Sequence, residues 1–92
     1  MSRRRVYNEK TLEVIGRFFE ALDALIADGT LRGFQTYSRL YGIDKRHMYA
    51  QKRDYGRGYF EVYWLMPIIT EYSISSEWLL FGRGPMRKQR KV

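Results

Sequence analysis

The residues best suited to chemistry are the basic and aromatic side chains of the stretch 45–53, KRHMYAQKR. Positions three and four apart share one face of a helix, so Lys45, Arg46 and Tyr49 fall together. Arginine and lysine donate hydrogen bonds to O6 and N7 of guanine in the major groove, and tyrosine can contact a thymine methyl or a phosphate. A solvated basic helix without a ligand is the alternative for this stretch. The expected DNA contacts here are Lys45, Arg46, His47, Tyr49, Lys52 and Arg53.

The residues before this stretch predict a scaffold of one helix and a tight turn. Apolar and aromatic residues recur at helical spacing in residues 34–41. Gly42 follows, and glycine takes the left-handed conformation at a helix end without a Cβ clash. Ile43 is expected to tuck into the turn, and Asp44 is expected to cap the next helix, 45–53. The pattern predicts a helix-turn-helix that presents a basic second helix to DNA.

Three further residues are candidates for contact with the DNA backbone. Gln35 and Thr36 stand at the start of the first helix, where backbone N–H groups have no partner within the helix. Arg57 lies in the stretch 54–60, DYGRGYF, whose two glycines predict an irregular loop. These glycines do not form a phosphate-binding P-loop, because no Lys-Ser/Thr pair follows them. A plain turn is the simpler use of the glycines.

The charge distribution points to a polyanionic partner. The 92 residues carry a net charge of +7, with a sequence pI of about 9.9. Residues 32–57 contain seven basic and two acidic side chains, whereas residues 9–28 contain two basic and five acidic ones. No apolar run is long enough to span a bilayer, which favours nucleic acid over membrane. The lack of cysteine fits a reducing compartment, so we expect a cytoplasmic protein at the bacterial nucleoid.

Enzymatic and metal chemistry are not expected. His47 is the only histidine, and without a cysteine or a second histidine no metal site is predicted. No Ser–His–Asp set or activated cysteine exists, and the carboxylates are scattered along acidic segments. We therefore expect no enzyme activity, no cofactor, no metal and no small-molecule ligand.

Two further helices are expected to pack on the helix-turn-helix. Residues 9–28 carry an amphipathic stripe behind an Asn8 cap. Residues 63–72 predict one helix with Pro67 in its first turn, because proline has no N–H for a helix interior. A start at Pro67 itself is the alternative. The amphipathic stripe consists of Leu12, Ile15, Phe18, Phe19, Leu22, Leu25 and Ile26.

The end of the chain predicts a short helix followed by a tail. Ser75 is the expected cap of this helix and Gly82 its expected end. Residues 86–92, MRKQRKV, are expected to be disordered, and residues 1–8 to form a basic arm that either contacts phosphate or only aids solubility. The apolar residues expected to close the core are Trp78, Leu79 and Phe81.

An aromatic group in residues 55–64 leaves three roles open. It would cover a small core, form a dimer surface, or stack the bases of a single strand. The group consists of Tyr55, Tyr59, Phe60, Tyr63 and Trp64.

The closing sequence 74–86, ISSEWLLFGRGPM, resembles the (V/I)-S-x-x-W-L-L-x-G-x-G-x-M close of phage CI-repressor-type helix-turn-helix domains, part of the broad Cro/CI family. The resemblance covers residues 11–86. Gly42, Ile43 and Met48 match the family's turn glycine, the apolar residue after it and the buried position of the recognition helix. The chain departs from the family pattern at Phe34, Ser38 and Gln51, where the family favours glutamine, alanine and an aliphatic residue.

The resemblance implies an all-α, compact five-helix lambda-repressor-like bundle that often binds DNA as a two-fold dimer. We expect a basic arm at 1–8, a helix-turn-helix domain at 9–84 and a basic tail at 85–92. The expected function is sequence-specific binding of double-stranded DNA by a small, repressor-like transcriptional regulator of bacterial or phage type. Two alternatives stay open: an architectural or recombination accessory factor of a mobile element, and a protein-interaction module whose basic face binds an acidic protein.

Overall fold

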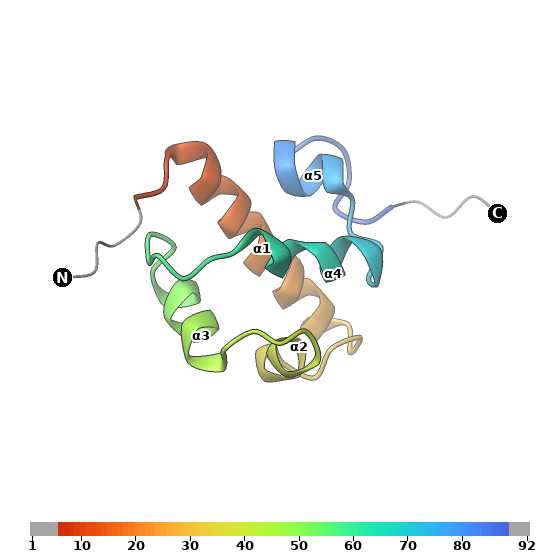
Figure 1. The fold of residues 1–92 in the computed structure, drawn as a ribbon. Coiled ribbons are helices and arrows are strands. Elements are labelled where there is room, and N and C mark those ends of the chain that lie inside the picture. The colour runs from red at the N-terminus through yellow and green to blue at the C-terminus, as the bar shows by residue number, and fades with distance from the viewer. Residues whose placement is uncertain (1–5, 89–92) are drawn as a thin grey trace.

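The computed structural model of the chain describes residues 6–88, and the elements in that range are helices (Figure 1). No strand occurs there, and β-type pairing is limited to an isolated bridge between Ile74 and Arg87. The predicted all-α class is confirmed. No helix within 6–88 is long and apolar enough to cross a membrane. In chain order the elements are α1 (Glu9–Ala27), α2 (Phe34–Leu40), α3 (Lys45–Arg53), the 3-10 helix η1 (Val62–Leu65), α4 (Met66–Thr70) and α5 (Ser76–Phe81).

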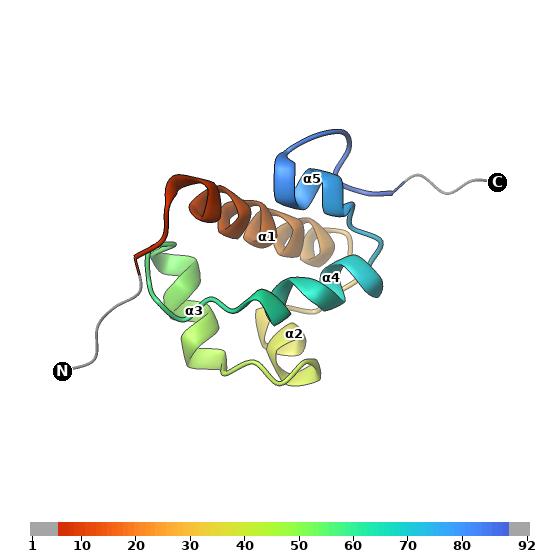
Figure 2. The same ribbon diagram turned by 45° about the horizontal axis from the view of Figure 1, so that its top comes forward.

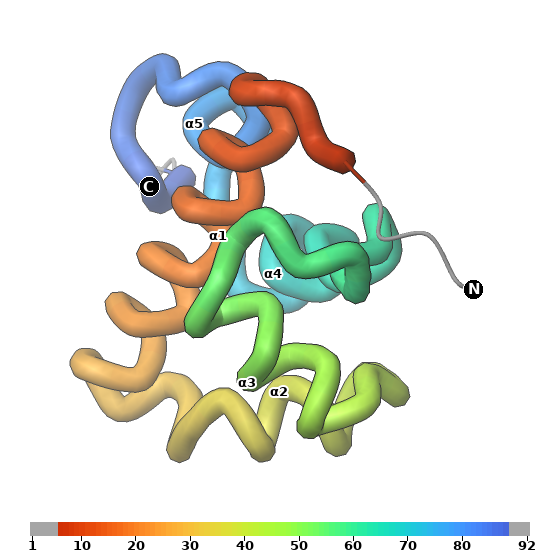
Figure 3. Tube along the Cα trace, turned by 90° about the vertical axis from the view of Figure 1, so that its left-hand side faces the viewer, coloured from red at the N-terminus to blue at the C-terminus, as the bar shows by residue number. Residues whose placement is uncertain are grey.

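The longest helix, α1, runs through the middle of the molecule. The helix α5 lies on one side of α1, and α2 and α3 lie on the other (Figure 2). Direct contacts join α5 to α1, α2 to α3, and η1 to α4. A view from the side shows α2 and α3 at one end of the molecule and α5 at the opposite end (Figure 3). The basic segment of the chain is therefore well separated from α5.

The start of α1 is fixed by a local cap. The side-chain oxygen of Asn8 accepts a hydrogen bond of 2.9 Å from the Thr11 N–H, as predicted. The helix ends at Ala27, one residue before the predicted end, and Gly29 follows with a φ of +84°. The predicted stripe is the core face, although its outermost members, Leu12 and Ile26, are only half-buried. The buried residues of α1 are Ile15, Phe18, Phe19, Ala21, Leu22 and Leu25.

The connection between α2 and α3 is the predicted glycine turn. Gly42 has a φ of +69°, in the left-handed region that favours glycine. The Ile43 N–H donates to the Ser38 carbonyl at 2.9 Å, and the Ile43 side chain is buried. A side-chain oxygen of Asp44 accepts hydrogen bonds from the Arg46 and His47 N–H groups. The turn and the cap of α3 are thus both confirmed.

The helix predicted over residues 63–72 is divided into two pieces. In η1 the bonding is of the 3-10 type, and the Met66 N–H donates to the Tyr63 carbonyl. Pro67 then stands in the first turn of α4, as predicted. Because Pro67 has no N–H to donate to that carbonyl, the tighter bond from the preceding residue replaces the α-helical one. The single continuous helix was therefore a wrong prediction.

Phe18 of α1 lies at the centre of an aromatic core. Its ring makes edge contacts with Phe19, Tyr37 and Phe60 at centroid distances of 5.1, 5.8 and 6.2 Å. The buried Tyr37 hydroxyl donates to the Trp64 carbonyl at 2.5 Å, so this polar group is satisfied inside the core. Burial also raises the pKa of the Tyr37 hydroxyl above its usual value. Phe60 and Trp64 therefore belong to the core.

The last helix closes the core with fewer residues than expected. Ser75 Oγ accepts the Trp78 N–H at 3.2 Å, and Gly82 ends the helix with a φ of +70°, both as predicted. Leu79 is fully buried, whereas Phe81 is 62% exposed. Phe81 is two positions beyond Leu79, or about 200° around the helix axis, so it points away from the core. The prediction that Phe81 closes the core was wrong.

The chain after α5 folds back onto the segment before it. Residues 86–88 form backbone hydrogen bonds of 2.8 and 2.9 Å with Ser75 and Ser73. These bonds contradict the expected disorder for this part of the tail. Residues 89–92 of the tail and residues 1–5 of the expected basic arm lie outside the described residues.

Candidate nucleic-acid interface

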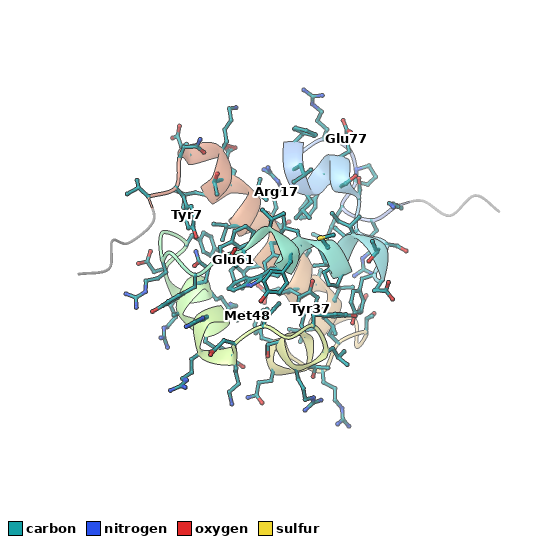
Figure 4. The ribbon with its side chains drawn as sticks, in the orientation of Figure 1. Tyr7, Arg17, Tyr37, Met48, Glu61 and Glu77 are labelled. Carbon is teal, nitrogen blue, oxygen red and sulfur yellow. The ribbon has the colours of Figure 1, made fainter. Side chains whose placement is uncertain are left out.

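The helix α3 places basic side chains on the side away from the core. Met48 lies on the inner side of α3 and is buried, as predicted (Figure 4). Arg46, Tyr49 and Arg53 are separated by three and four residues and share the outer face. Arg46 and Arg53 are exposed, and so is Lys45. Within residues 6–88, none of the three basic groups is paired with a carboxylate, because the ion pairs there form elsewhere.

The first turn of α3 is held by Asp44. Its carboxyl accepts the N–H groups of Arg46 and His47 at 2.8 and 3.2 Å. The hydrogen bond from the His47 backbone is the main cause that lowers the pKa of the Asp44 carboxyl. The ionised cap satisfies the free N–H groups of the turn from which Lys45 and Arg46 project.

Two of the expected contact residues pack on α2. The Tyr49 ring lies edge-on to Phe34 at 6.2 Å, and the Lys52 Nζ lies 4.8 Å from the centre of the same ring. Both side chains are half-buried. Phe34, where the resembled family favours glutamine, therefore serves as a packing surface between α2 and α3. Tyr49 and Lys52 border the exposed face and are tied to the scaffold.

The start of α2 lies beside this contact. Gln35 is exposed and Thr36 is half-buried, and both follow Phe34 directly. The Thr36 N–H donates to the Gly33 carbonyl at 3.2 Å. Phe34, which precedes them, touches the second half of α3.

The loop 54–60 reaches the first turn of α3 through an aromatic stack. The His47 and Tyr59 rings are parallel, with centroids 4.1 Å apart and an interplanar angle of 3°. The Arg57 guanidinium carbon lies 5.4 Å from the Tyr59 ring centre, and its Nη2 donates to the Tyr59 hydroxyl at 3.5 Å. Arg57 is exposed. The structure thus brings two expected contact residues, His47 and Arg57, together around Tyr59.

Gln51 is a residue whose role sequence reasoning missed. The sequence marked it only as a departure from the aliphatic residue of the resembled family, and its side chain is fully buried. Its Nε2 donates to the Tyr55 carbonyl at 2.6 Å, and its Oε1 accepts the N–H groups of Tyr59 and Phe60, each at 3.0 Å. A signal was present, because Gln51 follows the buried Met48 by three positions and so shares its face.

The aromatic group of residues 55–64 serves several purposes. Tyr55 stacks on Phe19 at 5.8 Å, and Tyr63 donates to the Gly42 carbonyl at 3.3 Å. With Phe60 and Trp64 in the core and Tyr59 on His47, each ring has a contact within the molecule. Tyr63 stays 44% exposed and Tyr55 40% exposed. Core cover is therefore one role of the group.

Comparison of the chain with protein-family models, curated proteins and solved structures gave no match. The geometry of α3 and its neighbours is what bears on function. Side chains with nitrogen tips extend outward from α2 and α3 at the end of the molecule opposite α5 (Figure 4).

Proposed function

We propose that this chain is a sequence-specific double-stranded DNA-binding protein with a lambda-repressor-like helix-turn-helix. It acts as a small, repressor-like transcriptional regulator of bacterial or phage type, at the nucleoid. The observation that carries the proposal is the outer face of α3, where Arg46 and Arg53 are exposed and not paired with described carboxylates. A helix is about 10–12 Å wide with its side chains, which suits the major groove of B-DNA at about 12 Å.

The residues around α3 divide into base contacts and backbone contacts. The side chains of Lys45 and Arg46 project from the capped first turn of α3, which is the part of a recognition helix that meets base edges. The planar guanidinium of Arg46 matches O6 and N7 of guanine with two parallel hydrogen bonds. Arg53 and Arg57 lie farther along the same end and contact phosphates. The remaining expected contacts, with phosphate or at the groove edge, are Gln35, Thr36, His47, Tyr49 and Lys52.

The closing motif of the chain supports the fold part of the proposal. Ser75 caps α5, and the helix places Leu79 against α1. The motif thus acts as scaffold, far from the basic end. In a two-fold dimer, the second copy would pack on the apolar side chains that η1 and α4 leave exposed. These are Val62, Tyr63 and Met66, at 72%, 44% and 59% exposure.

Selection of bound sequences from a random duplex pool tests the proposal directly. The wild-type chain is expected to enrich one sequence motif. Arg46→Ala is expected to lose the enrichment at one base pair, because a bidentate contact discriminates by about 1–3 kcal/mol. Arg83→Ala is the matched control, since Arg83 is an exposed arginine just after α5 at the far end of the molecule. It is expected to return the wild-type motif.

Salt dependence separates the alternatives. With about four to eight neutralised phosphates, the logarithm of affinity should fall against the logarithm of salt with a slope of roughly −0.9 per phosphate. A steep slope without an enriched motif would favour the architectural or recombination accessory factor. If the chain bound no duplex at any salt concentration, the remaining alternative would be an interaction module whose basic face binds an acidic protein.

A further inference from the structure

The buried amide of Gln51 joins α3 to the loop that follows it. Its side chain is 0% exposed, and all three of its hydrogen bonds go to backbone groups of the loop 54–60. A buried amide without partners is strongly unfavourable, so this geometry ties the loop to one position relative to α3. Two of the bonds meet at one oxygen, Oε1, which receives the N–H groups of Tyr59 and Phe60.

The position of Tyr59 decides where Arg57 lies. The Tyr59 N–H is held by Gln51, and its ring is stacked on His47 at 4.1 Å. Arg57 in turn lies over the Tyr59 ring and donates to its hydroxyl. The other side of the loop is closed by Asp54, whose carbonyl accepts the Arg57 N–H at 2.9 Å. A continuous set of contacts therefore runs from Gln51 through Tyr59 to Arg57.

We propose that Gln51 is a positioning residue for DNA binding, which acts through Tyr59 to hold the exposed Arg57 as a phosphate contact beside α3. This inference rests on the proposed function. A loop released from Gln51 would carry the guanidinium away from this place, so that one phosphate would lose its neutralising contact. The aliphatic residue that the resembled family favours at this position would offer the loop no hydrogen bond.

A double-mutant cycle on random duplex distinguishes positioning from a purely structural role. The readouts are the affinity and the slope of its logarithm against the logarithm of salt, measured for wild type, Arg57→Ala, Gln51→Met and the double variant. Arg57→Ala should reduce the slope by about 0.9, the value for one phosphate. Gln51→Met, which keeps the length of the side chain and removes its hydrogen bonds, should reduce the slope equally. The double variant should match either single variant.

Two outcomes of this cycle overturn the proposal. In the first, Gln51→Met lowers the melting temperature but keeps the wild-type slope, so Gln51 is structural only. In the second, Gln51→Met weakens binding as much in the Arg57→Ala background as in wild type, so the two residues act independently. If wild type binds no duplex at all, the proposed function fails, and the inference falls with it. If instead wild type binds duplex and Gln51→Met keeps the wild-type slope, only the inference about Gln51 fails.

A second variant covers the case in which Gln51→Met does not fold. Tyr59→Ala removes the ring between His47 and Arg57 and leaves the backbone N–H that bonds to Gln51. Tyr59→Ala should lower the slope as much as Arg57→Ala does. The double variant Tyr59→Ala/Arg57→Ala should lower the slope no further. Tyr55→Ala is the control, because Tyr55 stacks on Phe19 and its carbonyl, which accepts from Gln51, is retained. An unchanged slope in Tyr59→Ala would break the proposed set of contacts.

Discussion

Asp28 Oδ2 lies 2.6 Å from the Arg87 guanidinium, so an ion pair joins the end of α1 to the segment that folds back after α5. The other carboxyl oxygen of Asp28 accepts the Thr30 N–H at 2.8 Å. Hydrogen bonds from Thr30, followed by the contact with Arg87, lower the pKa of Asp28 to about 2. The ionised form of Asp28 is thus favoured in the folded chain.

This contact predicts a loss of stability in acid. The folded-state pKa of Asp28 is about 2, below the ordinary value of 3.8, so its contribution is present above about pH 4 and is lost as the pH falls towards 2. Asp28→Asn keeps an oxygen for the Thr30 N–H and removes the charge. The difference in free energy of unfolding between wild type and Asp28→Asn should therefore be largest near neutral pH and shrink between pH 4 and 2. Asp23→Asn, an exposed change on the same helix, controls for net charge. A difference that does not vary with pH would contradict the expectation.

A second pH dependence is expected in alkali. Burial, together with the hydrogen bond of 3.1 Å between the Tyr41 and Tyr72 hydroxyls, raises the pKa of Tyr72 to about 12. The folded-state pKa exceeds the ordinary value of 10.0, so the contribution of Tyr72 is present below pH 10 and is lost as the pH rises towards 12. Denaturant titrations at pH 9 and 11.5 should show a smaller alkaline loss of stability for Tyr72→Phe than for wild type. Equal losses would show that Tyr72 is not responsible.

The turn before α3 predicts a backbone effect that involves no clash. Gly42 has a φ of +69°, and nothing lies within 4 Å of an added Cβ. Gly42→Val should lower the free energy of unfolding by about 1–2 kcal/mol or more, because a β-branched residue resists the left-handed conformation. Gly33→Val is the matched control, since Gly33 is extended, with a φ of 177°, and its Cβ position is also open. Chemical denaturation measures the free energy of unfolding of both variants. Equal losses of stability would contradict a special role for the positive φ of Gly42.

Two variants distinguish a contact with a base from a contact with a phosphate. Arg46→Ala should weaken binding to the selected site by about 5- to 150-fold and barely change affinity for random duplex. Lys91→Ala, in the basic tail outside the described residues, should weaken both slightly and alike, and lower the salt slope by one unit at most. Wild type and both variants are titrated on both duplexes at one fixed salt concentration, and the slope is taken from a salt series. Equal ratios of specific to random affinity in the two variants would mean that α3 does not read sequence.

The helix caps and the glycine turn depend on residues four or fewer positions apart, and they could be predicted from the sequence. The caps at Asn8, Asp44 and Ser75 bond to N–H groups two or three residues on, and the turn at Gly42 needs only the φ that glycine allows. Such bonds join residues that are always close in the chain. The sequence pattern that predicts them therefore does not depend on how the rest of the chain packs. The exposed basic face of α3 belongs here too, because helical spacing alone separates Arg46 from the buried Met48.

Other features were decided only by the tertiary structure. Helical spacing places Gln51 on the face of the buried Met48, but the partners of its amide come from the loop 54–60 as it returns over α3. Arg87 meets Asp28 across a separation of 59 residues, and Phe81 is exposed because no element within residues 6–88 covers its side of α5. The type of a residue gives it a preference for burial or exposure. Burial itself also requires another part of the chain to pack against that residue. The position of that part follows from the packing of the whole chain.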